Sequence, residues 1–429
     1  MDELITLQET QRRLAAAVIP LCAERAPLSG ALGRTLANGV RAETDMPPFD
    51  RAMLDGYAVR AEDVAAAAPA APVVLREGGP TVFAGSRPGA VCLPGTAVRT
   101  MTGAPLAQGA DAVVRVEFTA QDGNGTVRIL RGAPAGEAVQ PRGFGLRAGD
   151  EVAPAGACID ALTLAAIAAH GHAEVRVARR PRVALAAIGS ELATAGGTME
   201  TGQLYDSNSH MLRSLVTEWG GDPLDGGACA DGIEDMTSLL GALWDSADAL
   251  VTTGGVAAGD GDLTPYALEL LGARRLFWGV WMRPGTPVYA CERGGKVALA
   301  LSGNPGAAYV DAVMLLLPLL YRLAGAPQRL RGHVATARIA ADPGKRPTRH
   351  TRFLRGQLFM RGAELWIDLG MGQSSGIPQR QGSALAVIGP GEAVREGAAC
   401  AVIVERALPF SGVEDGGLAD DALHRCFGI

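Results

Sequence analysis

The spacing of apolar residues predicts a different kind of element in each part of the chain. Residues 4 to 20 carry apolar side chains at near-helical spacing, which predicts an amphipathic helix. Residues 43 to 142 hold short β-prone runs broken by Gly and Pro, which indicates a mostly β module. The stretch "LRAGDEVAPAGACIDALTLAAIAAHG", which starts at Leu146, predicts a strand, a turn and a helix in series.

Three uniformly apolar runs lie between residues 178 and 325, and each ends in a glycine-containing turn. They are "PRVALAAIGSEL" from residue 181, "ADALVTTGGV" from residue 247 and "KVALALSGNPGAAYVDAVMLL" from residue 296. Strands buried on both faces are uniformly apolar, so these runs, with helical segments between them, predict a parallel α/β sheet. Ligands of such sheets bind outside the carboxyl ends of the strands, so we expect all three turns at one crevice.

Short β-prone runs return after residue 327, namely "VATARIA", "RFLRGQLFM", "LAVIG" and "CAVIVER". They predict a small C-terminal β domain, followed after Phe410 by a Gly- and Asp-rich tail that we expect to be poorly ordered. The predicted fold class is therefore α/β plus β. A length of 429 residues favours two to four domains.

Composition and charge indicate whether the protein binds a membrane or nucleic acid and in which cellular compartment it works. The most apolar run, "AVMLLLPLLYRLAG" from residue 312, is preceded by Asp311 and interrupted by Arg322, which favours a buried helix over a membrane span. The net charge of −6 argues against general electrostatic capture of nucleic acid. The acidic N-terminus shows no secretory signal, and seven scattered cysteines without a CxxC pair indicate reduced core cysteines. We therefore expect a cytoplasmic protein.

The turn "TTGGVAAGDGDLTP", residues 252 to 265, has the composition of an anion-binding loop. Gly254 and Gly255 remove side chains where backbone N–H groups would face a ligand, and Asp262 or Thr264 can cap the next helix. "SGNPGAAYV" repeats this design with Ser302 and Asn304 before the helix-opening Pro305. Taken singly, each could be a plain βα turn. Together they predict a phosphate or a phosphorylated ring as ligand.

Other nucleotide and hydrolase motifs do not meet their structural requirements. The sequence contains no GxxxxGK[ST] and no GxSxG. "GFGLRA" at residue 143 matches GxGxxA literally, but it follows "EAVQPR" and not an apolar strand. The sequence therefore does not support a dinucleotide-binding or serine-hydrolase interpretation.

Eight stretches, taken in order, are similar to motifs of the molybdopterin molybdenumtransferases, the family that includes the C-terminal domain of gephyrin. Single motifs are weak, but eight in series at the expected spacings are specific. They are "PPFDRAMLDGYAVR", "RTMTGAPLAQGADAVVRVE", "RPRVALAAIGSEL", "GQLYDSNSHML", "TTGGVAAGDGD", "MRPGTPV", "LSGNPGAAYV" and "TRFLRGQL".

The resemblance implies a fold, a reaction and partners. Family members are usually dimeric and take adenylylated molybdopterin and molybdate, release AMP, and use a divalent cation, normally Mg²⁺. A molybdopterin adenylyltransferase and apo-molybdoenzymes are the implied partners. The implied domains are an α/β pterin-binding domain (1–20 and 176–326), an elongated connecting domain (21–42 and 143–175), a β-rich domain closing the partner's site (43–142) and a C-terminal β domain with a flexible tail (327–429).

The resemblance also implies site residues at the matching positions. Carboxylates near a phosphoanhydride suit Mg²⁺, which prefers oxygen ligands, and arginine grips oxyanions bidentately. The implied catalytic residues are Asp55, Thr102, Glu191 and Arg355, and the implied metal ligands are Asp231, Asp262 and Glu191. The implied pterin-binding residues are Gly254, Gly255, Val256, Arg283, Ser302, Gly303, Asn304, Pro305, Ser374 and Ser375.

Several positions depart from the family pattern. Removing one positioned charge can slow a reaction by orders of magnitude, so the alternative is a noncatalytic paralog that binds molybdopterin or its molybdenum form as a carrier or scaffold. Arg142 or Arg147 could replace the lost cations in space. The departures are Gln140 and Pro141 for two arginines, Phe144 and Gly145 for two acids, Ile188 for threonine, Ala257 for serine, Thr286 for lysine and Ser302 for proline.

Overall fold

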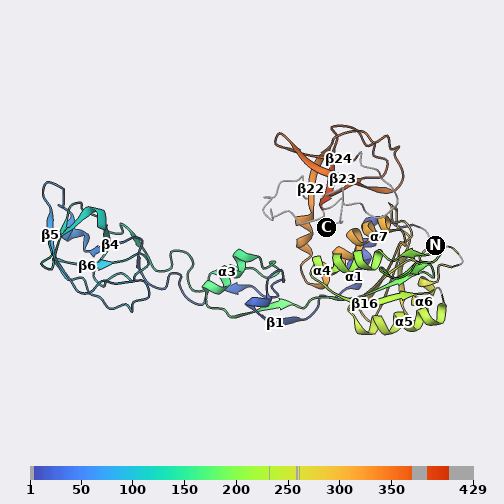
Figure 1. Ribbon diagram of the computed structural model, residues 1–429, viewed down its shortest axis with the longest axis horizontal. Helices are drawn as coiled ribbons and strands as arrows, with labels where there is room; N and C mark the ends of the chain where they lie inside the picture. Colours follow the sequence, from blue (N-terminus) through green and yellow to red (C-terminus); the bar gives the residue numbers. More distant parts are fainter. Residues whose placement is uncertain (1–3, 231, 258, 260, 370–383, 405–429) are drawn as a thin grey trace. The chain divides into compact units, whose positions relative to one another are not determined.

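The computed structural model describes residues 4–230, 232–257, 259, 261–369 and 384–404 (Figure 1). Contacts within the chain divide it into two units. The α/β unit comprises Met1–Ala37, Gly156–Ile159 and Arg176–Ile429, and the β-rich unit comprises Asn38–Ala155 and Asp160–Val175. The β-rich unit is thus inserted in sequence between two parts of the α/β unit. The four-domain division is finer than these two units and stays a prediction.

A six-stranded sheet forms the centre of the α/β unit, in the order β16-β13-β17-β21-β20-β18. The three predicted apolar runs are its adjacent parallel strands β13, β17 and β21. The sheet also continues through β20, which is antiparallel to β21 because the two-residue Gly294–Gly295 turn, with positive φ at both residues, reverses the chain, and through β18, which pairs antiparallel with β20. The strands are β16 (Asp222–Cys229), β13 (Arg182–Ile188), β17 (Ala249–Thr253), β21 (Lys296–Leu301), β20 (Tyr289–Arg293) and β18 (Arg274–Trp278).

Helices cover both faces of this sheet. Alternate residues of β13 enter different cores, since Val183 and Leu185 pack with one set of helices and Ala184 and Ala186 with the other. Figure 1 shows α5 and α6 on one side of the sheet and α1, α4 and α7 on the other. The helices are α1 (Leu7–Ala17), α4 (Asn208–Glu218), α5 (Ile233–Ser246), α6 (Thr264–Leu270), α7 (Pro305–Asp311) and α8 (Leu317–Leu323).

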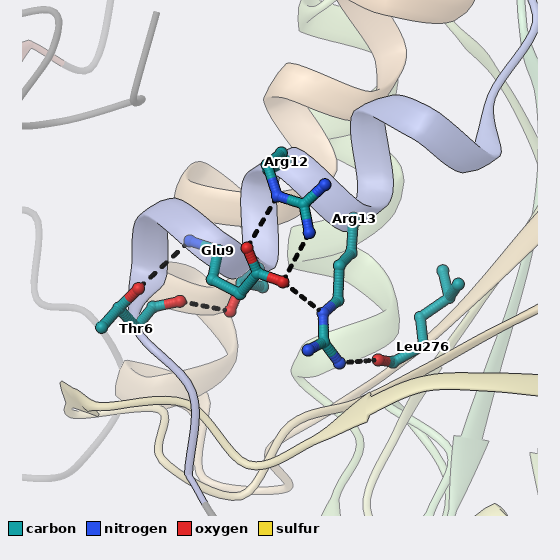
Figure 2. A network of polar contacts seen from close by, with 6 residues as sticks. Thr6, Glu9, Arg12, Arg13 and Leu276 are labelled. Carbon is teal, nitrogen blue, oxygen red and sulfur yellow. Dashed lines mark hydrogen bonds and ion pairs between the residues drawn. The ribbon is translucent and has the colours of Figure 1, made fainter.

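The predicted N-terminal helix is present as α1 and is fixed at its start by side-chain hydrogen bonds (Figure 2). The Thr6 hydroxyl accepts the Glu9 N–H at 3.2 Å, which caps the helix one residue before Leu7. The Glu9 carboxylate accepts from Arg12 and Arg13, each at 2.7 Å. Arg13 also donates to the Leu276 carbonyl of β18 at 2.7 Å, which ties the helix to the edge of the sheet.

The long apolar run after Pro305 is a core helix, as its interruption by charge predicts. Pro305–Leu323 is long and apolar enough by length and composition to cross a membrane, but 78% of its most apolar window is buried. A π-helical turn over Ala312–Leu316 separates α7 from α8. Pro318 follows directly and has no N–H to donate to the preceding turn, which accounts for a wider turn at this point.

The C-terminal part of the α/β unit is a small closed β-barrel with strand order β23-β24-β22-β26-β25 and a closing β25–β23 pair; the short β19 adds to β23. The four β-prone runs predicted here are β22, β23, β25 and β26, and β24 is an additional strand. The tail after Phe410 lies outside the described residues. The strands are β19 (Met282–Arg283), β22 (Val334–Ile339), β23 (Thr351–Arg361), β24 (Glu364–Asp368), β25 (Ala384–Ile388) and β26 (Ala399–Val404).

The β-rich unit is built on a six-stranded sheet in the order β7-β4-β6-β5-β9-β8. Its six strands lie between residues 56 and 129, within the range 43 to 142 predicted to be mostly β. The strands of the sheet are β4 (Gly56–Val59), β5 (Val73–Glu77), β6 (Thr96–Thr100), β7 (Ala112–Arg115), β8 (Thr119–Gln121) and β9 (Thr126–Ile129). Two further antiparallel pairs are β2 (Val40–Arg41) with β11 (Glu151–Ala153) and β3 (Arg51–Ala52) with β10 (Val139–Gln140). The helices of the unit are α2 (Ala61–Val64) and α3 (Ala161–Ala169).

The remaining elements are short connections. They are β1 (Ala23–Pro27), β12 (Glu174–Ala178), β14 (Leu192–Ala193), β15 (Leu204–Tyr205) and 3₁₀ turns at Leu28–Gly30, Val116–Phe118 and Pro327–His333. Of the six cysteines in the described residues, all are free thiols, and Cys22 and Cys158 are exposed. The expectation of core cysteines is therefore wrong for these two.

Candidate functional site

A cavity of about 400 Å³ opens at the carboxyl ends of β13, β17 and β21. The turns after these three strands line it together with the segment that leads into α4, so segments far apart in sequence meet here. Eight of the residues singled out from the sequence are among the lining residues, namely Glu191, Gly254, Gly255, Val256, Asp262, Ser302, Gly303 and Pro305. Asn304 lies in the same turn.

The glycine turn after β17 approaches its neighbours so closely that side chains do not fit. A Cβ on Gly254, whose φ is +89°, would lie 2.1 Å from the Ile188 carbonyl oxygen at the end of β13. A Cβ on Gly255, whose φ is +61°, would lie 2.6 Å from the Thr264 hydroxyl. Only glycine fits these positions without displacing the turn, because both backbones are left-handed and crowded. The backbone itself therefore forms this wall of the cavity.

Asp262 and Thr264 do not cap α6, so this expectation is wrong. The Asp262 carboxylate accepts the Gly259 N–H at 2.8 Å and closes its own loop. The Thr264 hydroxyl donates to the Gly254 carbonyl at 3.2 Å and fastens the glycine turn to the start of the helix. The helix begins after Leu263 without a side-chain cap, with Pro265 in its first turn.

The turn after β21 is held by four hydrogen bonds. Asn304 caps α7 by accepting the N–H groups of Gly306 and Ala307 at 3.1 and 3.3 Å. The Gly303 carbonyl accepts from the Asn208 amide at 2.8 Å. The Ser302 N–H donates to the buried Asp311 carboxyl at 2.9 Å. Because these donors are already engaged, a ligand would meet the outward groups of the turn.

Asp206 and Asn208 are lining residues that the sequence interpretation did not single out. They belong to the "YDSN" segment, where the signal is a run of polar residues before a helix. Asp206 accepts the Ser209 N–H at 3.0 Å and so satisfies the first turn of α4. Asn208 is only 8% exposed, and its Oδ1 has no hydrogen-bond partner among the described residues. A buried carbonyl oxygen of this kind is an acceptor for a ligand N–H.

Trp278 is a third residue that sequence reasoning missed. Its indole N–H donates to the Val256 carbonyl at 3.0 Å from the buried side of the glycine turn. Its ring makes edge contacts with Tyr266 and Tyr289, at centroid distances of 5.9 and 5.8 Å. Since Val256 lines the cavity, Trp278 fixes the position of a cavity wall without touching the cavity.

The two cations expected at the site do not line the cavity. The Arg355 guanidinium lies 4.9 Å from the centroid of the Tyr309 ring on α7, at the junction of the barrel and the sheet. Arg283 is exposed on the short strand β19. Thr286, which replaces a family lysine, donates to the Met282 carbonyl at 2.6 Å and stabilises its own turn. The cavity wall is therefore formed by neutral and acidic groups.

Three carboxylates, from Glu191, Asp206 and Asp262, line the cavity, but they do not form a metal cluster. Within the described residues, no group of three or more His, Cys, Asp or Glu side chains is placed to hold a metal ion. Asp231, Ser374 and Ser375 lie outside the described residues. A divalent cation thus does not fit the described part of the site as a protein-only cage.

The β-rich unit brings Asp55 and Thr102 together. Asp55 Oδ1 accepts both the Thr102 N–H and the Thr102 hydroxyl, each at 2.7 Å. These two hydrogen bonds, with a smaller contribution from Arg99, hold the pKa of the exposed Asp55 carboxyl below its ordinary value. The adjacent Gly56 is required by packing, because a Cβ there would lie 2.0 Å from the Val114 carbonyl oxygen. The result is an ionised carboxylate with a fixed orientation on the surface of its unit.

Arg142, a proposed replacement for the lost arginines, is engaged within the β-rich unit. Its guanidinium donates to Asp45 at 2.5 Å and its backbone N–H to Asp50 at 2.7 Å. Gln140 accepts from Arg51 at 2.7 Å. Asp50 therefore has a local role in holding the loop around residue 142.

The fold and the cavity define an α/β protein with a ligand crevice at the carboxyl edge of its parallel strands. Residues 5–171 match the model of the MoeA N-terminal region, domains I and II, and residues 184–322 match that of a probable molybdopterin binding domain. The chain is 32% identical over 370 residues to the molybdopterin molybdenumtransferase of Bacillus subtilis, covering 85% of each protein. It is 34% identical over 352 residues to molybdopterin molybdenumtransferase 2 of Mycobacterium tuberculosis, covering 80% of this chain and 86% of that protein.

The chain therefore belongs to the molybdopterin molybdenumtransferase family, and the resemblance of its motifs to that family is confirmed. A crystal structure of the molybdopterin biosynthesis MoeA protein of Pyrococcus horikoshii has a TM-score of 0.81 and 28% identity, covering 94% of this chain and all of that one. This match confirms the predicted fold class of α/β plus β.

Proposed function

We propose that the protein inserts molybdenum into adenylylated molybdopterin with molybdate as the metal source and AMP as the released product. The observation that carries this proposal is the cavity, in which three glycine-containing turns present backbone and neutral polar groups next to carboxylates. A flat pterin needs close backbone approach and N–H acceptors, and Asn208 Oδ1 supplies one acceptor. The relatives of this chain are named molybdopterin molybdenumtransferases, which is consistent with transfer of molybdenum to molybdopterin.

Different residues of the chain would bind the ligand and take part in the chemical step. In the cavity, Gly254 and Gly255 admit the ligand to the backbone, and Asn208 orients it. Asp55, already ionised and held by Thr102, would accept a proton or orient an attacking oxygen. Arg355, which lies against α7, would hold an oxyanion such as molybdate.

The assay of the proposed reaction contains Mg²⁺, for which the described residues form no protein-only site. The described carboxylates do not gather into a protein cage, and Mg²⁺ usually keeps waters and binds through one or two carboxylates plus substrate phosphates. Such an ion would supply charge neutralisation at the phosphoanhydride.

We further propose that the protein works as a homodimer in which the β-rich unit of one subunit supplies Asp55 to the cavity of its partner. In support, Asp55 is exposed on its own unit. Large apolar side chains are also exposed on that unit, namely Phe83, Leu93 and Leu162. Exposed apolar groups of this size favour a protein interface.

AMP release tests the proposed reaction directly. Purified protein is incubated with adenylylated molybdopterin and Mg²⁺, with and without molybdate, and AMP is separated and quantified. We expect AMP only when molybdate is present. Pterin binding without AMP release under both conditions would support the noncatalytic carrier instead; no observation on the described residues favours that alternative, since Asp55, Glu191, Asp262 and Arg355 are all present.

A further inference from the structure

Asp311 is a fully buried carboxyl directly behind the cavity that the proposed reaction does not use. It ends α7 and has no solvent exposure. Its Oδ2 accepts the Ser302 N–H at 2.9 Å, and Ser302 lines the cavity. One hydrogen bond therefore links the buried acid to the cavity turn of residues 302–305.

The other oxygen of Asp311 faces a second turn. A Cβ on Gly285, whose φ is +99°, would lie 1.9 Å from Asp311 Oδ1, so the 282–286 turn packs its bare backbone against this oxygen. Oδ1 has no hydrogen-bond partner among the described residues. Asp311 is thus clamped between the Ser302 turn, which lines the cavity, and the Gly285 turn, which leads into the cavity-lining Pro287.

No charge compensates an ionised Asp311. Burial raises its pKa to about 8, hydrogen bonding from Ser302 opposes this shift, and no charged group contributes. The elements that pack around α7 carry few charged or titratable side chains, and none pairs with Asp311 in the described residues. They are Arg283 of the second turn, Arg355 of β23, Lys296 of β21, and His210, Arg213 and Glu218 of α4.

We propose that Asp311 is a positioning residue of the cavity, and that its protonated form is the one that holds the Ser302 and Gly285 turns in the arrangement able to bind an anionic ligand. An ionised Asp311 would place an unsolvated negative charge directly behind the Ser302 turn, which is the turn that meets the ligand. The inference rests on the proposed function, since it takes adenylylated molybdopterin, a phosphate-bearing ligand, as the occupant.

The first measurement needs no ligand. A carboxyl with a raised pKa binds its proton more tightly in the folded state, so its contribution to stability falls between the unfolded and folded pKa values and levels off above the latter. Compared with Asp311→Asn, the unfolding constant of the wild type should rise about 50-fold from pH 6 to pH 8 and change little beyond. Parallel pH profiles for the two proteins would overturn the inference.

The second measurement is the affinity for adenylylated molybdopterin at pH 7 and pH 9, followed by tryptophan fluorescence. If only the protonated form binds, wild-type affinity should fall about tenfold between these pH values, while Asp311→Asn should change less than twofold. Glu234→Gln, on the exposed side of α5, is the matched acid-to-amide control and should follow the wild type.

The possible outcomes distinguish a failure of the role of Asp311 from a failure of the proposed function. A wild-type affinity that is equal at both pH values overturns the role of Asp311, even if Asp311→Asn does not fold, and leaves the proposed function standing. An Asp311→Asn protein as pH-dependent as the wild type overturns it too. No binding to any protein at any pH overturns the proposed function and the ligand part of the inference, while the unfolding series still decides whether Asp311 is protonated in the fold.

Discussion

The cavity of the α/β unit and the Asp55–Thr102 pair of the β-rich unit differ in what their surroundings provide. The cavity is enclosed by backbone turns, and its polar side chain Asn208 is buried with an acceptor oxygen left over. The Asp55 carboxylate is exposed and receives two hydrogen bonds from one neighbour. The cavity therefore has the features of a binding site for a ring. The Asp55–Thr102 pair has those of an ionised carboxylate that is accessible to a ligand.

This difference teaches that binding and chemistry are specified by separate stretches of the chain. Crowded glycines and a buried indole preorganise the cavity, so changes there should alter affinity. Asp55 contributes little to any packed core, so changes there should alter turnover alone. Three sets of variants test this separation.

The largest effect is expected for Asp55→Ala. Because a positioned acid or base is worth about 10² to 10⁴ in rate, turnover should fall at least 100-fold. Affinity for adenylylated molybdopterin and the unfolding temperature should stay close to the wild type, since the side chain is exposed. AMP release, ligand titration and thermal unfolding measure the three quantities.

Asp122→Ala is the matched control for this variant, since it removes an exposed acid of the same unit that pairs only with Arg128 across a surface hairpin. It should leave turnover unchanged, and wild-type turnover in Asp55→Ala would contradict the assigned role. Mixing Asp55→Ala with Glu191→Ala subunits should restore roughly a quarter of wild-type activity if the two residues act across a twofold dimer. No restoration would argue that each site lies within one subunit.

An intermediate effect is expected for Gly254→Ala. The new Cβ would meet the Ile188 carbonyl in a left-handed backbone, so the glycine turn must shift. We expect a loss of about 2 kcal/mol of folding stability and at least a tenfold loss of pterin affinity. Gly261→Ala adds the same methyl group to the same cavity loop with no atom within 4 Å, and it should change neither quantity. Equal behaviour of the two variants would remove the argument that the backbone forms the cavity wall.

The smallest effect is expected for Trp278→Phe, which deletes the N–H that holds Val256. Losing one buried hydrogen bond costs about 1 kcal/mol, so KM should rise about fivefold while kcat changes less than twofold. Trp244→Phe removes the same atoms from an equally buried indole whose N–H has no partner among the described residues. It should leave KM unchanged, and a similar KM shift in both variants would indicate general loosening of the core.

The sequence predicts most of the architecture because the central strands carry a strong signal. β13, β17 and β21 are uniformly apolar and end in glycine turns, which is why the crevice could be expected at their carboxyl ends. β16 has no such signal, since "DPLDGGAC" is a polar edge strand. The antiparallel strand β20 depends on a two-glycine turn that is short enough to be overlooked in a pattern of parallel strands.

The site is less predictable because its polar groups depend on contacts between distant residues. Asn208 meets Gly303 across 95 residues, and no local pattern indicates which of the polar residues in "YDSN" faces inward. Asp311 could be recognised in sequence only as a charge that directly precedes an apolar run. Motif matching placed Arg283 and Arg355 near the ligand, but it could not specify the direction of their side chains.

The anchoring of α1 has a consequence for how the protein is made. Arg13 donates to Leu276, which lies 263 residues later in the chain, and Gln11 donates to the Met314 carbonyl, 303 residues later. At synthesis rates of about 5 to 20 residues per second, the first helix leaves the ribosome roughly 10 to 50 s before its docking surface exists. The inserted β-rich unit can fold during that interval, while the apolar stripe of α1 stays uncovered. Until residues 276 and 314 are synthesised, the apolar side of α1 is therefore open to chaperones and to other nascent chains.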